Sequence, residues 1–250
     1  MDKQLKTGRS DRILRFLKVW NRIPLVTRVT DMFYGVKPSE QKVSCAGMTF
    51  DHPLGIAGGI DTTGELCNIA ASYGAGFVEI GPLDDIMAAI NNLRSNPSPV
   101  PVLAVLPDSG AEKAFALLYD FVDAVVADIK ESDFDPDSME MILQLRLYND
   151  EYKPVFFRIS REMTEEKLDE VMDYALSRGV DGIMAPGEKL EKVAEMALEH
   201  MDIICYGHFE DSSAVAAALK GGSKAVAITD KPGEMKPSFI KKVIKNIYTK

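Results

Sequence analysis

The fold class that the sequence predicts is α/β, specifically a parallel (β/α)8 TIM barrel with an N-terminal helical extension. The first observation is that short apolar segments alternate with stretches of helical length from Pro53 onward. The second is their number, because eight strand–helix units in roughly 200 residues fit a closed barrel. The third is that no GxGxxG turn follows the first strand, whereas an open doubly wound sheet usually carries one. We therefore predict an extension over residues 1–41 and a barrel over residues 42–250.

The extension contains a basic amphipathic helix. Ser10-Asp11 can cap a helix that runs to about Arg22, ahead of Ile23-Pro24. Basic residues surround an apolar stripe that recurs at i, i+3, i+4 and i+7 and therefore shares one face. The stripe can pack on the barrel, or residues 10–22 can lie in an anionic membrane surface. The residues of the stripe are Ile13, Phe16, Leu17 and Trp20.

The barrel is predicted to begin with a hairpin over residues 42–50 that closes its bottom. Helices are expected between the strands, for example over Thr164–Arg178, whose first turn is acidic, as the helix dipole favours. Others are expected over Glu65–Tyr73, Asp211–Leu219 and Pro237–Tyr248. The strands are short, and most are rich in Val, Ile or Phe. They are expected at Leu54–Ala57, Phe77–Ile80, Val102–Leu106, Ala124–Ala127, Val155–Ile159, Gly182–Met184, Ile203–Tyr206 and Ala225–Ile228.

Composition and charge exclude several classes of protein. The net charge of −9 argues against nucleic acid as a partner, although residues 1–30 carry eight basic and two acidic side chains. Three cysteines without a CxxC pair predict neither a disulfide framework nor a metal site. No apolar run approaches the ~20 residues of a membrane-spanning helix, and no secretory signal is present. A cytoplasmic protein is expected, peripheral on the inner face of the membrane if the basic helix meets lipid.

Candidate site residues lie where the predicted strands end, because barrels of this class place function at that rim. Glycines after the first and seventh strands, among them Gly58 and Gly207, allow a ligand to approach the backbone closely. The helix that follows Gly207-His208 can hold a phosphate at its N-terminus. Glu210 and Asp211 crowd that position, however, and they can instead serve as ordinary helix caps. We expect a small-molecule ligand at this barrel mouth.

Arg158 is the second notable feature of the predicted mouth. It lies on the fifth strand, and a permanently charged side chain near the barrel centre needs a partner. It can face an anionic ligand or a reduced cofactor, or it can pair internally with Glu79 or Asp128. No nucleophile–base constellation can be identified, so no catalytic residue is assigned.

The segment Val43–Glu65, VSCAGMTFDHPLGIAGGIDTTGE, resembles the class 2, quinone-linked dihydroorotate dehydrogenases, whose pattern reads roughly GLxFxNP[LV]G[LI]AAGxDKxGE. GAGFVEIG at 74–81 continues the match. Pro154–Met184 and Ile203–Ile228 are similar to later strands of that family, and the basic helix is similar to its membrane-associating extension. The resemblance implies a TIM barrel that binds FMN in its mouth and oxidises dihydroorotate to orotate in pyrimidine biosynthesis.

Some cofactor contacts carry over by position, and others are altered. Arg158 stands where the family has a flavin-contacting lysine, and it keeps the charge but not the compact ammonium. Gly207 matches one glycine of the phosphate-binding pair, and His208 replaces the other. The residues expected to bind FMN are Ala57, Gly58, Gly81, Arg158, Gly207, His208 and Thr229.

The substrate-binding motifs of the family are missing. Thr62 replaces the lysine after Asp61, and the asparagine-rich motif NR[ML]GFNN is absent. ADIKESD at 127–133 stands where the family has N[IV]SSPNT with its catalytic serine. Without a general base, which typically contributes ~10²–10⁴ in rate, dihydroorotate turnover is expected to be lost.

Three functions remain open at this point. The chain can be an FMN-dependent oxidoreductase with a changed substrate. It can be a catalytically degenerate barrel without flavin that acts as a binding or regulatory module. It can also be a barrel lyase or isomerase that uses Asp61, Glu79 or Lys130.

Overall fold

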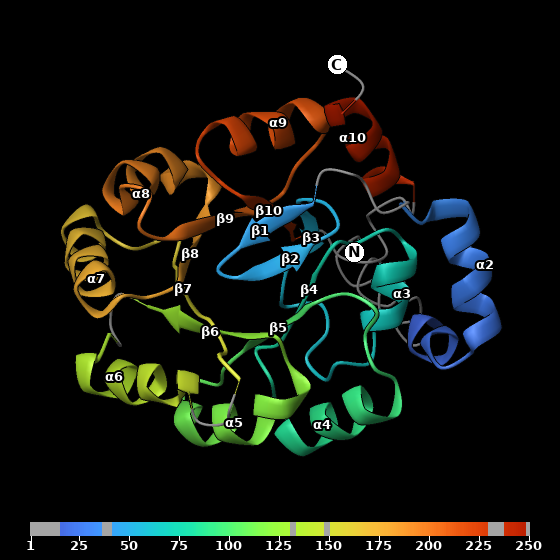
Figure 1. Cartoon of the computed structure of the whole chain (residues 1–250), viewed down its shortest axis with the longest axis horizontal. Coiled ribbons are helices and arrows are strands. Elements are labelled where there is room, and N and C mark those ends of the chain that lie inside the picture. Colours follow the sequence, from blue (N-terminus) through green and yellow to red (C-terminus); the bar gives the residue numbers. More distant parts are fainter. Residues whose placement is uncertain (1–15, 37–41, 131–133, 148–150, 230–237, 249–250) are drawn as a thin grey trace, which may run out of the picture.

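Eight parallel strands close into a barrel, in the order β10-β3-β4-β5-β6-β7-β8-β9 (Figure 1). The computed structural model describes residues 16–36, 42–130, 134–147, 151–229 and 238–248. The predicted fold class and all eight predicted strands are confirmed, with ends that shift by up to two residues. The strands are β3 (Leu54–Ile56), β4 (Val78–Ile80), β5 (Val102–Val105), β6 (Ala124–Ile129), β7 (Val155–Ile159), β8 (Gly182–Pro186), β9 (Asp202–Gly207) and β10 (Ala225–Ile228).

A ring of helices covers the outside of the barrel (Figure 1). Local signals explain where they begin and end. Thr164 caps α7 (Glu165–Arg178) by accepting a hydrogen bond from the Lys167 amide at 3.4 Å, and Gly179 ends this helix at φ 61°. Short 3₁₀ turns also occur at Tyr119–Phe121, Leu145–Leu147 and Gly187–Lys189. The outer helices are α3 (Cys67–Ser72), α4 (Ile86–Ser95), α5 (Ala111–Leu118), α6 (Pro136–Gln144), α7 (Glu165–Arg178), α8 (Leu190–Ala197), α9 (Ser212–Lys220) and α10 (Phe239–Tyr248).

The core has two parts, because each strand faces the barrel interior with every second residue. One part lies between the barrel and its helices, and the other fills the interior with side chains such as Phe77 and Phe156. Gly55 makes room for this interior packing, since a Cβ there would lie 2.4 Å from the Phe77 ring. Toward the mouth, the inward positions change from apolar to polar.

A hairpin of β1 (Val43–Cys45) and β2 (Met48–Phe50) covers the bottom of the barrel, as predicted (Figure 1). Phe50 stacks on Phe77 with 4.5 Å between the ring centroids. The turn is tethered by the Ala46 amide, which donates to Asp202 Oδ2 at 2.7 Å. His52, directly after the hairpin, is buried and accepts a hydrogen bond from the Leu54 amide. Burial lowers its pKa to about 4, so it stays neutral and structural.

The extension contains a second helix that the sequence did not predict. Residues 16–21, called the N-terminal helix below, are helical, and α2 (Pro24–Tyr34) follows. Pro24 ends one helix and begins the next, because its fixed φ suits the first turn of a helix. Ser10, Asp11 and Ile13 lie outside the described residues, as does the boundary expected at 41/42. No helix within the described residues is both long and apolar enough to cross a membrane.

Candidate functional site at the barrel mouth

Four polar side chains form the top layer of the barrel interior: Glu79 on β4, Asp128 on β6, Arg158 on β7 and Tyr206 on β9. Arg158 forms an ion pair with Glu79 and donates from Nη1 to Asp128 Oδ1 at 3.2 Å. Its guanidinium lies over the Tyr206 ring, 5.5 Å from the centroid. Of the two interpretations of Arg158, the structure therefore shows the internal pair. Arg158 pairs with both Glu79 and Asp128.

Burial sets the charges in this layer. It lowers the pKa of Arg158 to about 10, which leaves the guanidinium charged near neutral pH. Burial also raises the pKa of Asp128 to about 6, although Lys130 favours the ionised form. Tyr206 has its pKa raised to about 12 by burial and donates its hydroxyl proton to the Ile159 carbonyl at 2.7 Å. The layer is therefore a paired arrangement, in which Arg158 stays charged and the pKa of Asp128 is about 6.

The glycine turns after β3 and β4 bond to the protein itself. The Gly58 amide donates to Glu79 Oε2 at 2.6 Å, and the Gly59 amide donates to the Gly81 carbonyl at 2.5 Å. The Ala57 amide donates to the Ile228 carbonyl. A Cβ on Gly58 would lie 2.9 Å from the Gly81 carbonyl oxygen, so glycine is required for close packing of the two turns.

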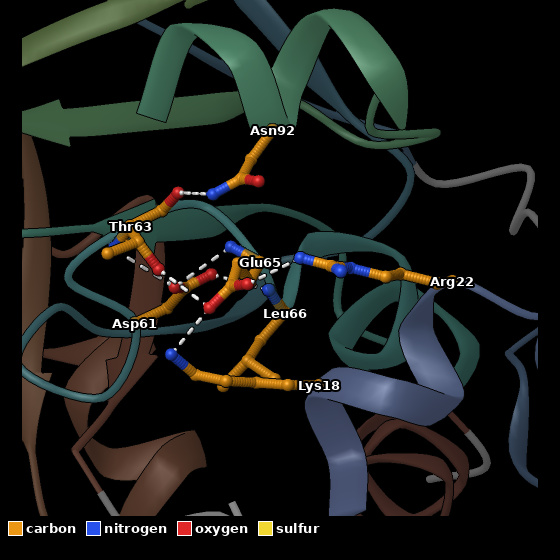
Figure 2. A network of polar contacts seen from close by, with 7 residues as sticks. All are labelled: Lys18, Arg22, Asp61, Thr63, Glu65, Leu66 and Asn92. Atoms are coloured by element: carbon orange, nitrogen blue, oxygen red, sulfur yellow. Dashed lines mark hydrogen bonds and ion pairs between the residues drawn. The ribbon is translucent and has the colours of Figure 1, made fainter. Parts of the chain in front are cut away.

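Asp61 organises the loop between β3 and α3. It is buried, and its carboxylate accepts hydrogen bonds from the amides of Thr63, Glu65 and Leu66 at 3.2, 3.0 and 2.7 Å (Figure 2). Burial raises its pKa, and the three amides oppose that shift. Asp61 and Glu79 thus have separate hydrogen-bond partners.

The turn after β9 carries the remaining predicted contacts. The Thr229 amide donates to the Gly207 carbonyl at 2.9 Å, and His208 is exposed. Asp211 caps α9 by accepting from the amides of Ser213 and Ala214 at 2.8 and 3.0 Å. The carboxylate therefore occupies the amides that a phosphate would need.

These observations test whether FMN fits the described mouth. Its implied donors are engaged: the Gly58 amide by Glu79, Arg158 by two carboxylates, and the α9 amides by Asp211. Of the three glycines that the resemblance places against FMN, Gly207 leaves the most space, with a Cβ there 3.6 Å from Arg161 Nη2. Apart from Arg158 Nε, which is buried and has no hydrogen-bond partner within the described residues, these implied donors are not free to bind FMN.

Sequence reasoning missed two residues of the mouth, Tyr206 and Arg161. Arg161 follows β7 and places its guanidinium 5.9 Å from the Tyr206 ring centroid, on a ring that Arg158 also contacts. Tyr206 could have been found, because it lies two residues after the inward-facing Ile204 on a predicted strand. Nothing in the local sequence marks Arg161.

Other chemistry is limited in the described chain. Cys205 is buried and its pKa is raised to about 11 by burial, so the thiol is not reactive near neutral pH. No group of three or more candidate metal-ligating side chains comes together within these residues. Residues 131–133, where the serine motif of the family would end, lie outside them.

Comparison with known proteins agrees with this fold. No family model matches the chain. It is 24% identical over 215 residues to a dihydroorotate dehydrogenase (quinone) of Hamiltonella defensa, covering 64% of each chain. A shorter segment is 41% identical over 51 residues to the Vibrio cholerae enzyme, covering 20% of this chain and 15% of that enzyme. The chain thus spans less than two thirds of the length of these curated relatives.

A solved structure, the Eimeria tenella DHODH in complex with ferulenol, superimposes with a TM-score of 0.69. It is 14% identical and covers 90% of this chain and 89% of that chain, which shows a shared fold.

Proposed function

We propose that this chain, a divergent relative of the quinone-type dihydroorotate dehydrogenases, binds a small molecule at its barrel mouth without flavin and does not oxidise dihydroorotate. The observation that carries the proposal is the Glu79–Arg158–Asp128 ion-pair layer. Separating one partner from a buried ion pair costs about 3–5 kcal/mol, because a charge is left unpaired. A flavin that recruited Arg158 would meet that cost, and it would find few free backbone donors to offset it.

Arg161 is the residue that we expect to meet the ligand. Its side chain is 47% exposed, and Glu188, its ion-pair partner, lies 3.8 Å away, beyond good hydrogen-bond distance. Gly207 lies beside it with room for an incoming group. A carboxylate or phosphate on a small molecule fits a guanidinium in this position. The module would thus recognise an acidic metabolite rather than transform it.

An FMN-dependent oxidoreductase with a changed substrate is the second candidate function. One observation favours it: Arg158 Nε is buried and has no hydrogen-bond partner within the described residues. An acceptor on a bound ring system could satisfy this donor. Sequence similarity to flavin enzymes supports the same candidate.

A visible absorption spectrum distinguishes the two functions. Wild-type protein, purified and then incubated with FMN and desalted, is expected to stay colourless and to show no dihydroorotate-dependent dye reduction. The matched variant carries Thr62→Lys, Arg158→Lys and His208→Gly, which restore the family residues. We expect this variant to retain more FMN than wild type. A flavin band in stoichiometric amount in the wild-type protein would overturn the proposal and favour the oxidoreductase.

We also propose peripheral membrane contact at the cytoplasmic face, through residues 10–22 together with α2. Leu17 is buried against the barrel, so the predicted apolar stripe is divided between packing and exposure. Seven large apolar side chains stay exposed on these two helices and on the turn between them, within 18 consecutive residues. They are Phe16, Val19, Ile23, Leu25, Val29, Met32 and Phe33.

A further inference from the structure

We infer that Glu65 is a latch for the N-terminal helix, and that an anionic lipid surface releases the helix by competing for Lys18 and Arg22. Glu65 lies in the loop after β3, and the two cations lie on or directly after the helix (Figure 2). This inference rests on the membrane contact proposed above and adds a regulatory role to it.

One carboxylate holds both cations. Lys18 Nζ lies 2.6 Å from Glu65 Oε2, and Arg22 Nη2 lies 2.8 Å from Glu65 Oε1. The hydrogen bond from Lys18 lowers the pKa of Glu65, so the latch is ionised near neutral pH. Glu65 is 19% exposed, whereas Lys18 and Arg22 are 37% and 62% exposed. Solvent, and therefore a competing anion, reaches the cations more readily than it reaches the carboxylate.

The helix has separate sides for the barrel and for an apolar surface. Leu17 and Asn21 face the barrel: Leu17 packs on Leu66 and Ile69, and Asn21 Oδ1 accepts from the Ile69 amide at 2.7 Å. Lys18 and Arg22 lie one position on, roughly 100° around the helix.

Phe16 and Val19 lie further round the same helix and are exposed. The two cations are thus at the border between the docked side and the apolar side. Long basic side chains at such a border can extend to lipid phosphates while the apolar side chains enter the membrane.

The latched loop connects to the barrel mouth. The amides of Glu65 and Leu66 donate to Asp61, and the Asp61 carbonyl accepts from the Gly81 amide at 2.7 Å. The same loop begins at Gly58, whose amide is bound by Glu79. Release of Glu65 therefore acts on a segment that holds the polar layer of the mouth, and not on an isolated helix.

An anionic surface can compete with Glu65, because both cations are accessible to solvent and surface ion pairs contribute little stability. An anionic membrane attracts each nearby Lys or Arg with a comparable or larger free energy. Removing the Glu65 charge should then free both cations for lipid and tighten binding roughly threefold to tenfold.

Trp20 makes the test direct, because it is the single tryptophan of the chain and lies on this helix. Full-length protein is titrated with vesicles of phosphatidylcholine alone or of phosphatidylcholine with phosphatidylglycerol, and Trp20 emission is recorded. Glu65→Gln is compared with wild type. Glu170→Gln is the matched control, because it removes an equal charge from the exposed Lys167–Glu170 pair on α7.

We expect Glu65→Gln to bind phosphatidylglycerol vesicles roughly threefold to tenfold more tightly than wild type, and Glu170→Gln to match wild type. Equal binding by the two variants overturns the latch alone. An equal gain on pure phosphatidylcholine, or the same emission change with inorganic phosphate, overturns the lipid surface as the competitor. If none of the three proteins binds vesicles, both the membrane contact and the latch are overturned. All of these outcomes are independent of the flavin spectrum.

Discussion

Arg158 holds the polar layer of the barrel mouth together through its ion pairs with two carboxylates. Where a compact ammonium stands in the resembling family, this chain has a planar guanidinium that reaches two carboxylates at once. Glu79 is 1% exposed and depends on that cation. The residue is therefore a structural requirement of the mouth as it stands.

Removing that cation should destabilise the protein strongly. Arg158→Met leaves Glu79 buried and unpaired, and we expect a loss of about 3–5 kcal/mol in the free energy of unfolding, measured in urea. Lys167→Met, which breaks the exposed pair with Glu170, is expected to cost less than about 1 kcal/mol. Similar losses for both variants would mean that the Arg158 pairs are not effectively buried.

Asp128 should give stability a measurable pH dependence. Its pKa is raised from 3.8 to about 6 in the folded chain, so the folded protein keeps a proton that the unfolded chain has lost. Stability from this group is fully present below about pH 4 and falls as the pH rises toward 6, by roughly 3 kcal/mol. Urea unfolding at pH 4 and pH 7 should show a smaller fall for Asp128→Asn. An unchanged fall would place the titration elsewhere.

The sequence identified both partners of Arg158 but could not choose between them. Glu79, Asp128 and Arg158 lie on three different strands, and their contacts depend on how the closed barrel staggers those strands. Periodicity along one strand carries no information on that stagger. The same reason explains why Arg161 was missed: its role comes from its distance to Tyr206, which no local pattern encodes.

At the scale of single elements, local chemistry was informative where capping was strong. The helix α7 was predicted with the help of its acidic first turn, because this signal acts within a few residues. In contrast, α2 was missed, since Ile23-Pro24 predicts a helix end and equally permits a helix start. Only packing against α3 decides between the two.

The cap of α9 makes a prediction at this scale. Asp211→Ala removes the carboxylate from the amides of Ser213 and Ala214 and should cost about 1 kcal/mol in stability. It also opens these amides to an anion, so added phosphate should restore part of the thermal stability. Asp85→Ala, which uncaps α4, is the control and should show a similar loss without rescue. Equal rescue of both variants would mean that α9 has no special access for phosphate.

The whole molecule depends on closure of the sheet. β10 pairs with β9 on one side and β3 on the other, so the last strand joins segments far apart in the chain. Alternation of strands and helices predicted this closure correctly, because eight strand–helix units are the number that a (β/α)8 barrel contains. The sequence pattern therefore predicted the fold. It did not predict the side-chain contacts of the mouth, because they join strands that only the closed barrel brings together.

Truncation tests the closure. A chain that ends at Lys220 lacks β10 and α10 and exposes the edges of β3 and β9. We expect it to aggregate and to show no cooperative unfolding by circular dichroism. A chain that ends at Tyr248 retains all of α10 and should unfold like the full-length protein. Cooperative unfolding of the shorter chain would mean that seven strands suffice.

The hairpin over the base of the barrel affects how small molecules can reach and leave the barrel mouth. Phe50 stacks on Phe77 beneath a packed interior, so in the described part of the chain side chains fill the base of the barrel below the Arg158 guanidinium. A small molecule would therefore enter and leave the mouth by the same path, through the loops that follow the strands. A molecule resident there would consequently block its own replacement, and the speed of exchange would be governed by those loops alone.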